Sequence, residues 1–319
     1  MQRTSDTYSK YGYIFCIPFL LAFLVFSLYP ILYTAVIGFT DLRGMGKIEF
    51  HFLAKPFENF NLILQNPSFR ISLQNTATIW IINFIPQIVL ALLLTAWFTN
   101  DRLRVKGQGA FKVMLYMPNI ITAATIAILF NSLFAYPMSP VNYLAVQFGF
   151  IAEPVNFLLQ KWTARGIVSF IQFWMWYGST MIVLIAGVLG ISPTLFEAAA
   201  IDGATGTQTF FRITLPSLRT ILLYTLITSM IGGLQMFDIP RLFLMGGPDN
   251  ATLTTSVFIY NQAFSGSYLY NRAAAASMIM FIIIAILSGI LFYVMRDKDA
   301  EKLKKANKEL IRAARRRAV

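Results

Sequence analysis

Residues 193–216 read PTLFEAAAIDGATGTQTFFRITLP, and they separate two long apolar runs of the chain. The proline at the start can begin a helix, because the first helical position needs no hydrogen-bonded N–H. Strong helix formers follow, and Gly203 is suited to end that helix at its C-terminus. Thr207 or Thr209 is positioned to cap a second short helix, which Pro216 then ends. The segment predicts a helix–turn–helix projection, named the knob here.

The sequence around the knob has the composition of a membrane protein. Of its 319 residues, 57% are hydrophobic and only 13% are charged, whereas a soluble domain carries about 25% charged residues. A membrane-crossing helix needs about 20 mainly apolar residues. Six stretches qualify: Ile14–Phe39, Thr76–Phe98, Val113–Phe134, Ile167–Leu189, Ile221–Met236 and Ala273–Met295. We therefore expect an all-α membrane protein with about six transmembrane helices.

The placement of basic residues predicts the orientation. Most of the 26 Lys and Arg residues lie at the two ends of the chain, in the loop 99–112 and in the knob. Cytoplasmic segments are enriched in Lys and Arg, so both termini and the knob are expected in the cytoplasm. The same bias accounts for the formal net charge of +12, and contact with membrane lipid, not with nucleic acid, is expected.

Three segments are expected along the chain. Residues 1–70 hold the N-terminal segment, the first span and the first outer loop, residues 71–295 hold five spans and the knob, and residues 296–319 form a basic tail. The apolar residues of the tail recur at helical spacing. Such a helix either lies on anionic headgroups or stays solvated, and both alternatives are open.

Several classes of function are disfavoured by what the sequence lacks. It contains no phosphate-binding G-x-x-x-x-G-K-[ST] motif and no recognisable catalytic nucleophile motif, so we do not expect an enzyme. The six expected spans contain no ionisable Asp, Glu, Lys, Arg or His, which argues against proton coupling but leaves sodium coupling open. The single His51 and single Cys16 give neither a metal site nor a disulfide framework.

The knob resembles the EAA loop of permeases in binding-protein-dependent ATP-binding-cassette importers. The matching residues are Glu197, Ala198, Ala199, Asp202, Gly203, Ala204, Phe210, Ile213, Leu215 and Pro216. The resemblance implies a type I importer permease fold, in which this loop docks into a cleft of an ATPase subunit. Glu197 would pair with a basic residue there, and Gly203 would form the turn. ATP and Mg would be bound by the ATPase, so no cofactor is expected in this chain. Relatives often have a further proline where this sequence has Thr220.

Other segments resemble the carbohydrate-uptake branch of that family, the group of the maltose F-type and glycerol-phosphate A-type permeases. They are Asn75-Thr76, Ala186-Gly187, Phe237-Asp238 and the outer loop with Gly246, Gly247 and Pro248. The resemblance implies a bacterial inner-membrane subunit that pairs with a second permease and with two copies of an ATPase. An extracytoplasmic solute-binding protein would face the loop at Gly246, Gly247 and Pro248.

Helical spacing suggests a solute pathway. On the fourth span Gln172, Trp176 and Ser179 recur at i, i+4 and i+7 and form one polar and aromatic stripe. Ser229, Gly233 and Met236 repeat this spacing on the fifth span, with Gln235 nearby, and Asn131 is a candidate on the third. Sugars are bound by hydrogen bonds and aromatic stacking. Close packing and interhelical hydrogen bonds are the alternative.

The predicted function is the permease subunit of an ATP-driven sugar importer, for an oligosaccharide. Two alternatives remain open. An importer of the same type could carry a non-sugar solute, or the chain could be a secondary carrier or channel that works without ATP.

Overall fold

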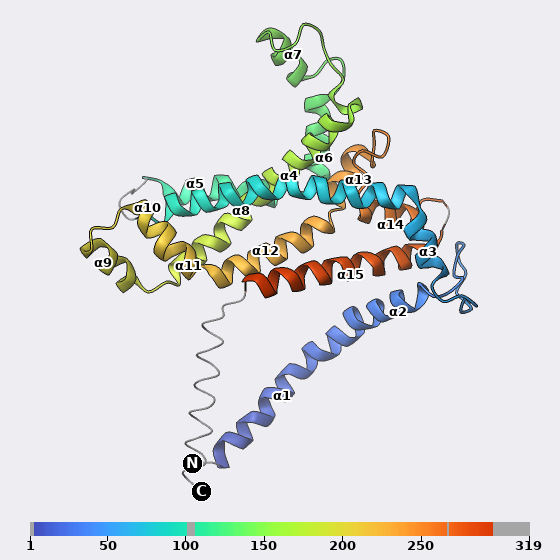
Figure 1. Ribbon diagram of the computed structural model, residues 1–319, viewed down its shortest axis with the longest axis horizontal. Helices are drawn as coiled ribbons and strands as arrows, with labels where there is room; N and C mark the ends of the chain where they lie inside the picture. Colours follow the sequence, from blue (N-terminus) through green and yellow to red (C-terminus); the bar gives the residue numbers. More distant parts are fainter. Residues whose placement is uncertain (1–2, 101–105, 267, 296–319) are drawn as a thin grey trace. The chain divides into compact units, whose positions relative to one another are not determined.

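Helices make up almost all of the regular structure. The computed structural model describes residues 3–100, 106–266 and 268–295 (Figure 1). Within these ranges the only strand-like pairing is an isolated bridge between Thr40 and Phe52. The α-helices and the π or 3₁₀ turns are α1 (Arg3–Phe23), η1 (Leu24–Leu28), α2 (Tyr29–Ile37), α3 (Glu58–Gln65), α4 (Pro67–Phe98), α5 (Gln108–Tyr116), η2 (Met117–Ile120), α6 (Ala123–Phe134), α7 (Pro140–Gln147), η3 (Phe157–Leu159), α8 (Lys161–Leu189), α9 (Pro193–Ile201), α10 (Gly206–Thr209), η4 (Phe210–Thr214), α11 (Leu215–Ser217), α12 (Arg219–Leu234), α13 (Asp238–Leu244), α14 (Thr255–Phe264) and α15 (Tyr270–Met295). The expected all-α class is confirmed.

Five helical segments of the described chain are long and apolar enough to cross a membrane, and a bent pair supplies the sixth. The five are Tyr11–Ile37, Pro67–Phe98, Lys161–Leu189, Arg219–Leu244 and Tyr270–Met295. The basic tail expected at residues 296–319 lies outside the described residues.

The third span differs from the continuous helix expected over Val113–Phe134. Its two halves, Gln108–Ile120 and Ala123–Phe134, meet at an angle of 91°. Pro118 lies in the 3₁₀ turn that ends the first half and has no N–H to continue the α-helical ladder. Thr122 has extended backbone angles and caps α6, since its hydroxyl accepts from the Thr125 N–H. A new helix therefore starts in a new direction.

The chain divides into two compact units. The first comprises residues up to Arg70 together with Ser256–Ile283. Within it, the buried Asn59 amide donates to the carbonyls of Gly38 and Thr40, both at 2.9 Å. Its oxygen accepts from Asn271 at 3.2 Å. One buried amide thus ties the start of the first outer loop to α3 and α15.

A second contact orders the same outer loop. The His51 backbone N–H donates to Asp41 Oδ1 at 2.8 Å. This hydrogen bond lowers the pKa of the Asp41 carboxyl, with a smaller contribution from the charge of the His51 side chain. The loop therefore has a defined conformation although it is exposed.

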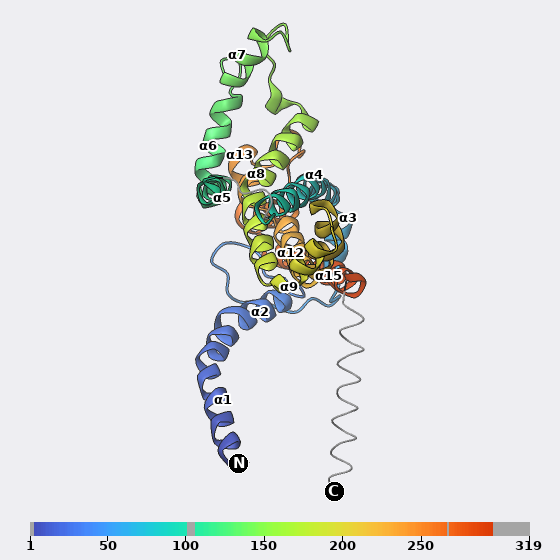
Figure 2. The same ribbon diagram turned by 90° about the vertical axis from the view of Figure 1, so that its left-hand side faces the viewer.

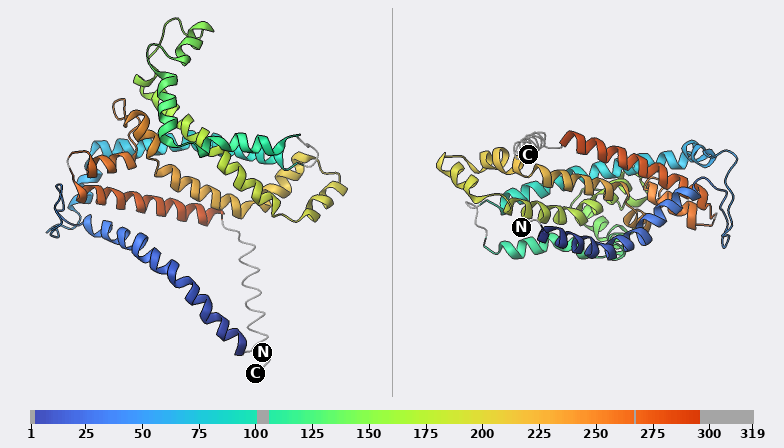
Figure 3. Two further views of the ribbon diagram at one scale, coloured as in Figure 1. Left: turned by 180° about the vertical axis from the view of Figure 1, so that it is seen from behind. Right: turned by 90° about the horizontal axis from the view of Figure 1, so that it is seen from below.

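The second unit, Ile71–Thr255 with the residues from Ile284 on, contains the packed core of α4, α5, α8 and α12. One apolar cluster centres on Val168 and Ile171, and another on Met181 and Leu184. Helices α5 and α8 approach closely at Gly178, where a Cβ would run into the backbone of α5. Small residues allow such contacts between membrane helices. Helix α6 adds Ile126 and Phe130 to the first cluster, and Figures 2 and 3 show α7 beyond its far end, away from this core.

Candidate functional site

Helices α4, α8 and α12 enclose a cavity of about 300 Å³. Amides, hydroxyls, one indole and two glycines dominate its wall, and no lining residue is charged. The lining residues are Asn83, Gln87, Gln172, Trp176, Ser179, Thr180, Val183, Tyr224, Thr225, Thr228, Ser229, Gly232, Gly233 and Met236. This is an uncharged hollow in which polar groups are set into a largely apolar wall.

Gln87 joins all three helices at the cavity wall. Its side chain is 5% exposed, and Nε2 donates to Thr180 Oγ1 at 2.8 Å and to Ser229 Oγ at 3.2 Å. One helical turn earlier, Asn83 Nδ2 donates to the Ile79 carbonyl at 2.9 Å. Both amides use only their nitrogen in these contacts. Their oxygens remain available to accept a hydrogen bond from a cavity ligand.

Gln172 is the most unusual of the lining residues. Its side chain is only 8% exposed, yet it makes no hydrogen bond to any residue in the described part of the chain. Buried amides are normally satisfied by protein, water or ligand. The amide therefore offers donors and an acceptor to whatever occupies the cavity. Trp176, 48% exposed and one turn further on, adds an aromatic face.

Gly233 has a packing role besides lining the cavity. A Cβ at this position would collide with the indole of Trp80, whereas a Cβ on the neighbouring Gly232 would meet nothing within 4 Å. The Trp80 Nε1 is buried without a hydrogen-bond partner among the described residues. Glycine is therefore needed at position 233 so that α4 and α12 can pack together.

The structure brings most of the expected pathway residues together. Gln172, Trp176, Ser179, Ser229, Gly233 and Met236 all line the cavity. Two others lie outside it: Asn131 donates to the Phe243 carbonyl at 3.3 Å, and Gln235 is the exposed C-cap of α12. The sequence analysis missed Asn83 and Gln87. Their spacing could have indicated them, because two amides four residues apart in an apolar run lie on the same face of a helix.

The outer loop after α13 is held by buried polar groups. Asn75, which is 1% exposed, donates to the carbonyls of Asn250 at 2.6 Å and Leu253 at 3.1 Å. Arg165 Nε donates to the Ala251 carbonyl at 2.8 Å. The loop therefore has a defined conformation, since its carbonyls are bound by side chains of two spans.

The glycines at the start of this loop form its turn. Gly246 has φ +88°, in the region that favours glycine, and its N–H donates to the Pro240 carbonyl at 3.1 Å. The Thr252 hydroxyl donates to the Gly247 carbonyl at 2.6 Å. Gly246, Gly247 and Pro248 therefore belong to an ordered turn that follows α13.

The first half of the knob ends as the sequence predicts. Helix α9 stops at Ile201, and Gly203 has φ +72°. The Gly203 N–H donates to the Ala200 carbonyl at 3.2 Å, and the Ala204 N–H donates to the Ala199 carbonyl at 2.9 Å. This pair of bonds is a Schellman C-cap, which accounts for glycine at position 203.

The second half of the knob differs from the prediction at both ends. Thr205, not Thr207 or Thr209, caps α10, and it forms a capping box with Gln208. Pro216 does not end the helix but lies inside α11, directly after the π-helical turn η4. A wider turn accommodates a proline that cannot donate to the ladder.

The knob exposes both acidic and apolar side chains. Glu197 and Asp202 are exposed, as are Ile201 at 86% and Phe211 at 60%. Apolar groups exposed on a compact projection are typical of a protein-docking surface.

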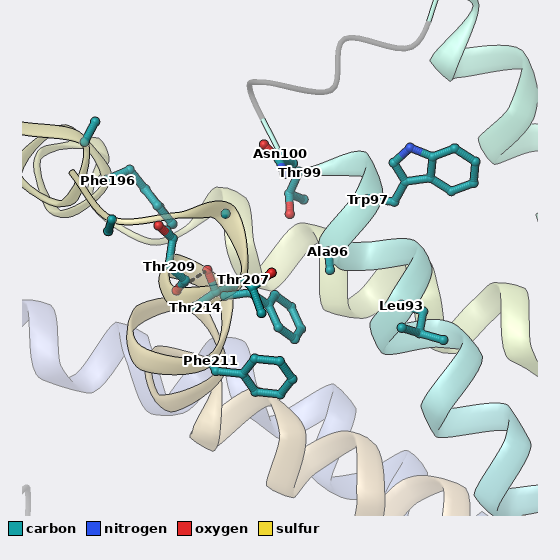
Figure 4. Close-up of a pocket in the computed structure, with 14 residues that line it drawn as sticks. Leu93, Ala96, Trp97, Thr99, Asn100, Phe196, Thr207, Thr209, Phe211 and Thr214 are labelled. Carbon is teal, nitrogen blue, oxygen red and sulfur yellow. Dashed lines mark hydrogen bonds between the residues drawn. The ribbon is translucent and has the colours of Figure 1, made fainter.

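A groove of about 440 Å³ separates the knob from the end of α4. Figure 4 shows Phe211 pointing toward the side of α4 that carries Leu93 and Ala96. The knob is thus a preformed element packed beside a span.

The apolar helices and the uncharged cavity between three of them are features of a multi-span membrane transport protein. Residues 62–301 match the family of binding-protein-dependent transport system inner membrane components, and the chain belongs to that family. It is 33% identical to the lactose transport system permease protein LacF of Rhizobium radiobacter, covering 91% of this chain and 96% of that protein. It is also 33% identical to the arabinooligosaccharides transport system permease protein AraP of Bacillus subtilis, covering 89% and 88%. The resemblance to the carbohydrate-uptake branch is confirmed.

A solved structure shares the fold. It is a bacterial alginate ABC transporter in complex with an alginate pentasaccharide-bound periplasmic protein. One of its chains matches with a TM-score of 0.73 at 23% identity, covering 92% of this chain and 97% of that chain. The expected type I importer permease fold is confirmed.

Proposed function

We propose that this chain is the permease subunit of an ATP-driven oligosaccharide importer and that the knob transmits the motion of an ATPase to the spans. The observation that carries the proposal is the uncharged cavity between α4, α8 and α12, with the unpartnered amide of Gln172 in its wall. Free amide groups and an aromatic face suit the hydroxyls and apolar face of a neutral sugar. Relatives named for lactose and arabinooligosaccharides support the same substrate class.

Coupling is proposed to run through the knob. Its acidic Glu197 and Asp202 and its exposed Phe211 offer charge and apolar area to an ATPase cleft. The capped ends of α9 and α10 support a rigid element, which can transmit a displacement. The proposed cycle converts ATP-driven closure of two ATPase copies into alternating access of the pathway.

Three kinds of partner complete the proposed assembly. A second permease would close the pathway, because the cavity of one chain is small, and two ATPase copies would dock in the cytoplasm. A solute-binding protein would deliver sugar to the outer loops, including Gly246, Gly247 and Pro248. The sugar-bound periplasmic protein in the alginate transporter complex supports this last partner.

The test of coupling is a tagged pull-down from native membranes. We expect the wild type to retain an ATPase and a second permease, and a variant with Glu197→Lys and Gly203→Pro to lose the ATPase. Glu49→Lys, the same charge change on the outer side, is the matched control and should retain both. A chain recovered alone, unaffected by either variant, would favour a secondary carrier.

The test of the pathway is sugar uptake by the reconstituted complex. Gln172→Ala with Trp176→Ala should abolish uptake while leaving assembly intact, because both the hydrogen-bonding amide and the aromatic face are removed. Normal sugar uptake by this variant would rule out a role of Gln172 and Trp176 in the solute pathway. A panel of sugars and polyols, scored by the thermal shift of the binding protein, would separate sugar from non-sugar solutes.

A further inference from the structure

The segment between α6 and α8, residues 135–160, is called the outer arm here, and its role is not explained by transport. With the knob in the cytoplasm, as the basic residues predict, it connects the outer ends of two spans, because α8 leads directly into the knob. Figures 1 and 2 show α7, at the tip of the outer arm, away from the core helices of its unit. Its surface is apolar: Tyr136, Met138, Tyr143, Leu144, Phe148 and Phe150 are between 48% and 93% exposed.

Charge is absent over an unusually long stretch. Between Lys112 and Glu153 the sequence has no Asp, Glu, Lys, Arg or His. Exposed apolar patches of this kind are unstable against water and mark a contact with protein or membrane. The outer arm also contains irregular backbone around α7, which the hydrocarbon core of a bilayer does not tolerate. The headgroup–acyl boundary of a membrane accepts both exposed apolar side chains and irregular backbone.

The outer arm is nevertheless ordered internally. Asn142 is 1% exposed and exchanges two hydrogen bonds with the Val155 backbone, at 3.0 and 3.1 Å. The Asn142 N–H donates to the Ser139 hydroxyl, which caps α7. The polar side chains thus point inward while the aromatic ones point outward. An apolar groove of about 640 Å³ lies beside α7 between Met138 and Tyr143.

The exposed face of α7 is apolar and uncharged, which favours lipid over a protein partner. Tyr143, Leu144 and Val146 are all exposed, and successive helical residues point about 100° apart. Their side chains therefore lie within an arc of about 160°, on one side of the helix, while Asn142 and Ala145 on the other side are less exposed. A helix in the headgroup–acyl boundary turns one apolar face toward the acyl chains, and this face carries no charged group that could pair with a protein. Tyr side chains suit the boundary between headgroups and acyl chains.

We propose that the outer arm lies in the headgroup–acyl boundary of the outer leaflet and anchors the outer ends of α6 and α8 there. The proposal depends on the orientation of the chain and not on the solute or on the ATPase.

Spin-label accessibility tests the proposal. Single cysteines at Tyr143, Leu144 and Val146, in a Cys16→Ala background, would be labelled in the complex as purified with its partners. The complex would be reconstituted in phosphatidylethanolamine–phosphatidylglycerol vesicles. We expect all three labels to favour oxygen over a water-soluble nickel reagent, at a depth of about 5–10 Å. Lys47→Cys, exposed in the first outer loop, is the control and should favour the nickel reagent.

Two results would overturn the proposal. If the three labels behave like Lys47→Cys, the outer arm lies in water. If one of them is immobile and shielded from both reagents, a protein covers that face instead. Uptake by each cysteine variant would verify that labelling has not unfolded the outer arm. Because the readout is accessibility, it remains interpretable even if the pull-down finds no ATPase.

Discussion

Arg165 and Lys161 lie one helical turn apart on α8, and both contact the outer loop after α13. Arg165 Nε donates to the Ala251 carbonyl at 2.8 Å and Nη2 donates to Asn75 Oδ1 at 2.7 Å. Its guanidinium also lies 5.0 Å from the centre of the Trp162 ring. We predict that Arg165→Met releases this loop, whereas Lys161→Met leaves it in place.

The magnitudes follow from burial. A hydrogen bond to a charged group contributes about 1.5–3 kcal/mol, and Arg165 makes two, in a half-buried setting that reduces each. The loss in the free energy of local opening should be about 2–4 kcal/mol. Lys161 pairs with Asp249 at 3.5 Å, but these side chains are 55% and 81% exposed. Such pairs contribute about 0–1 kcal/mol.

Hydrogen exchange of the peptide covering 246–255 measures this difference. Each 1.4 kcal/mol corresponds to a factor of ten, so Arg165→Met should accelerate exchange by about 30-fold to 10³-fold when opening is at equilibrium. Lys161→Met should change it less than about fivefold. Equal acceleration in the two variants, or none in Arg165→Met, would refute the idea that the hydrogen bonds of Arg165 to Ala251 and Asn75 stabilise the loop.

Three further substitutions test close packing and capping. Gly178→Ala should lower the melting temperature in detergent, because its Cβ meets the backbone of α5 at 2.9–3.0 Å, whereas Gly166→Ala has open space and should not. Gly233→Ala should shift tryptophan emission and cost about 1–3 kcal/mol by displacing an indole; an identical effect from Gly232→Ala would contradict this explanation. Thr205→Ala removes an N-cap worth about 1 kcal/mol, and unchanged proteolysis of the knob would argue that its capping box is dispensable.

Local signals account for what the sequence predicted well. The end of α9 depends on Gly203 and its near neighbours alone, so the C-cap can be inferred from the residue order. The cap of α10 was assigned two or four residues too late, to one of the two threonines that follow Thr205 at alternate positions. The sequence does distinguish Thr205, because Gln208 three residues later completes a capping box, whereas Phe210 and Arg212 follow Thr207 and Thr209 at that distance.

Features that depend on contacts between helices were harder to predict. Gln172, Trp176 and Ser179 form one stripe on a single helix, so their spacing is visible in sequence. Asn83 and Gln87 show the same spacing on α4, but their significance depends on Thr180 and Ser229, which come from other spans. Asn131 was expected to line the pathway but donates to the Phe243 carbonyl instead. A lone amide in an apolar run can serve either purpose.

The break in the third span shows how a pattern of apolar residues can conceal a change of direction. Hydropathy is continuous from Val113 to Phe134, and hydropathy alone does not register a turn. The local chemistry does, because Pro118 removes a donor and Thr122 supplies a cap for a new helix. The 91° bend directs α6 toward the outer arm instead of continuing along α5. The proline and the threonine therefore direct α6, and the charge-free arm that follows it, away from the axis of α5.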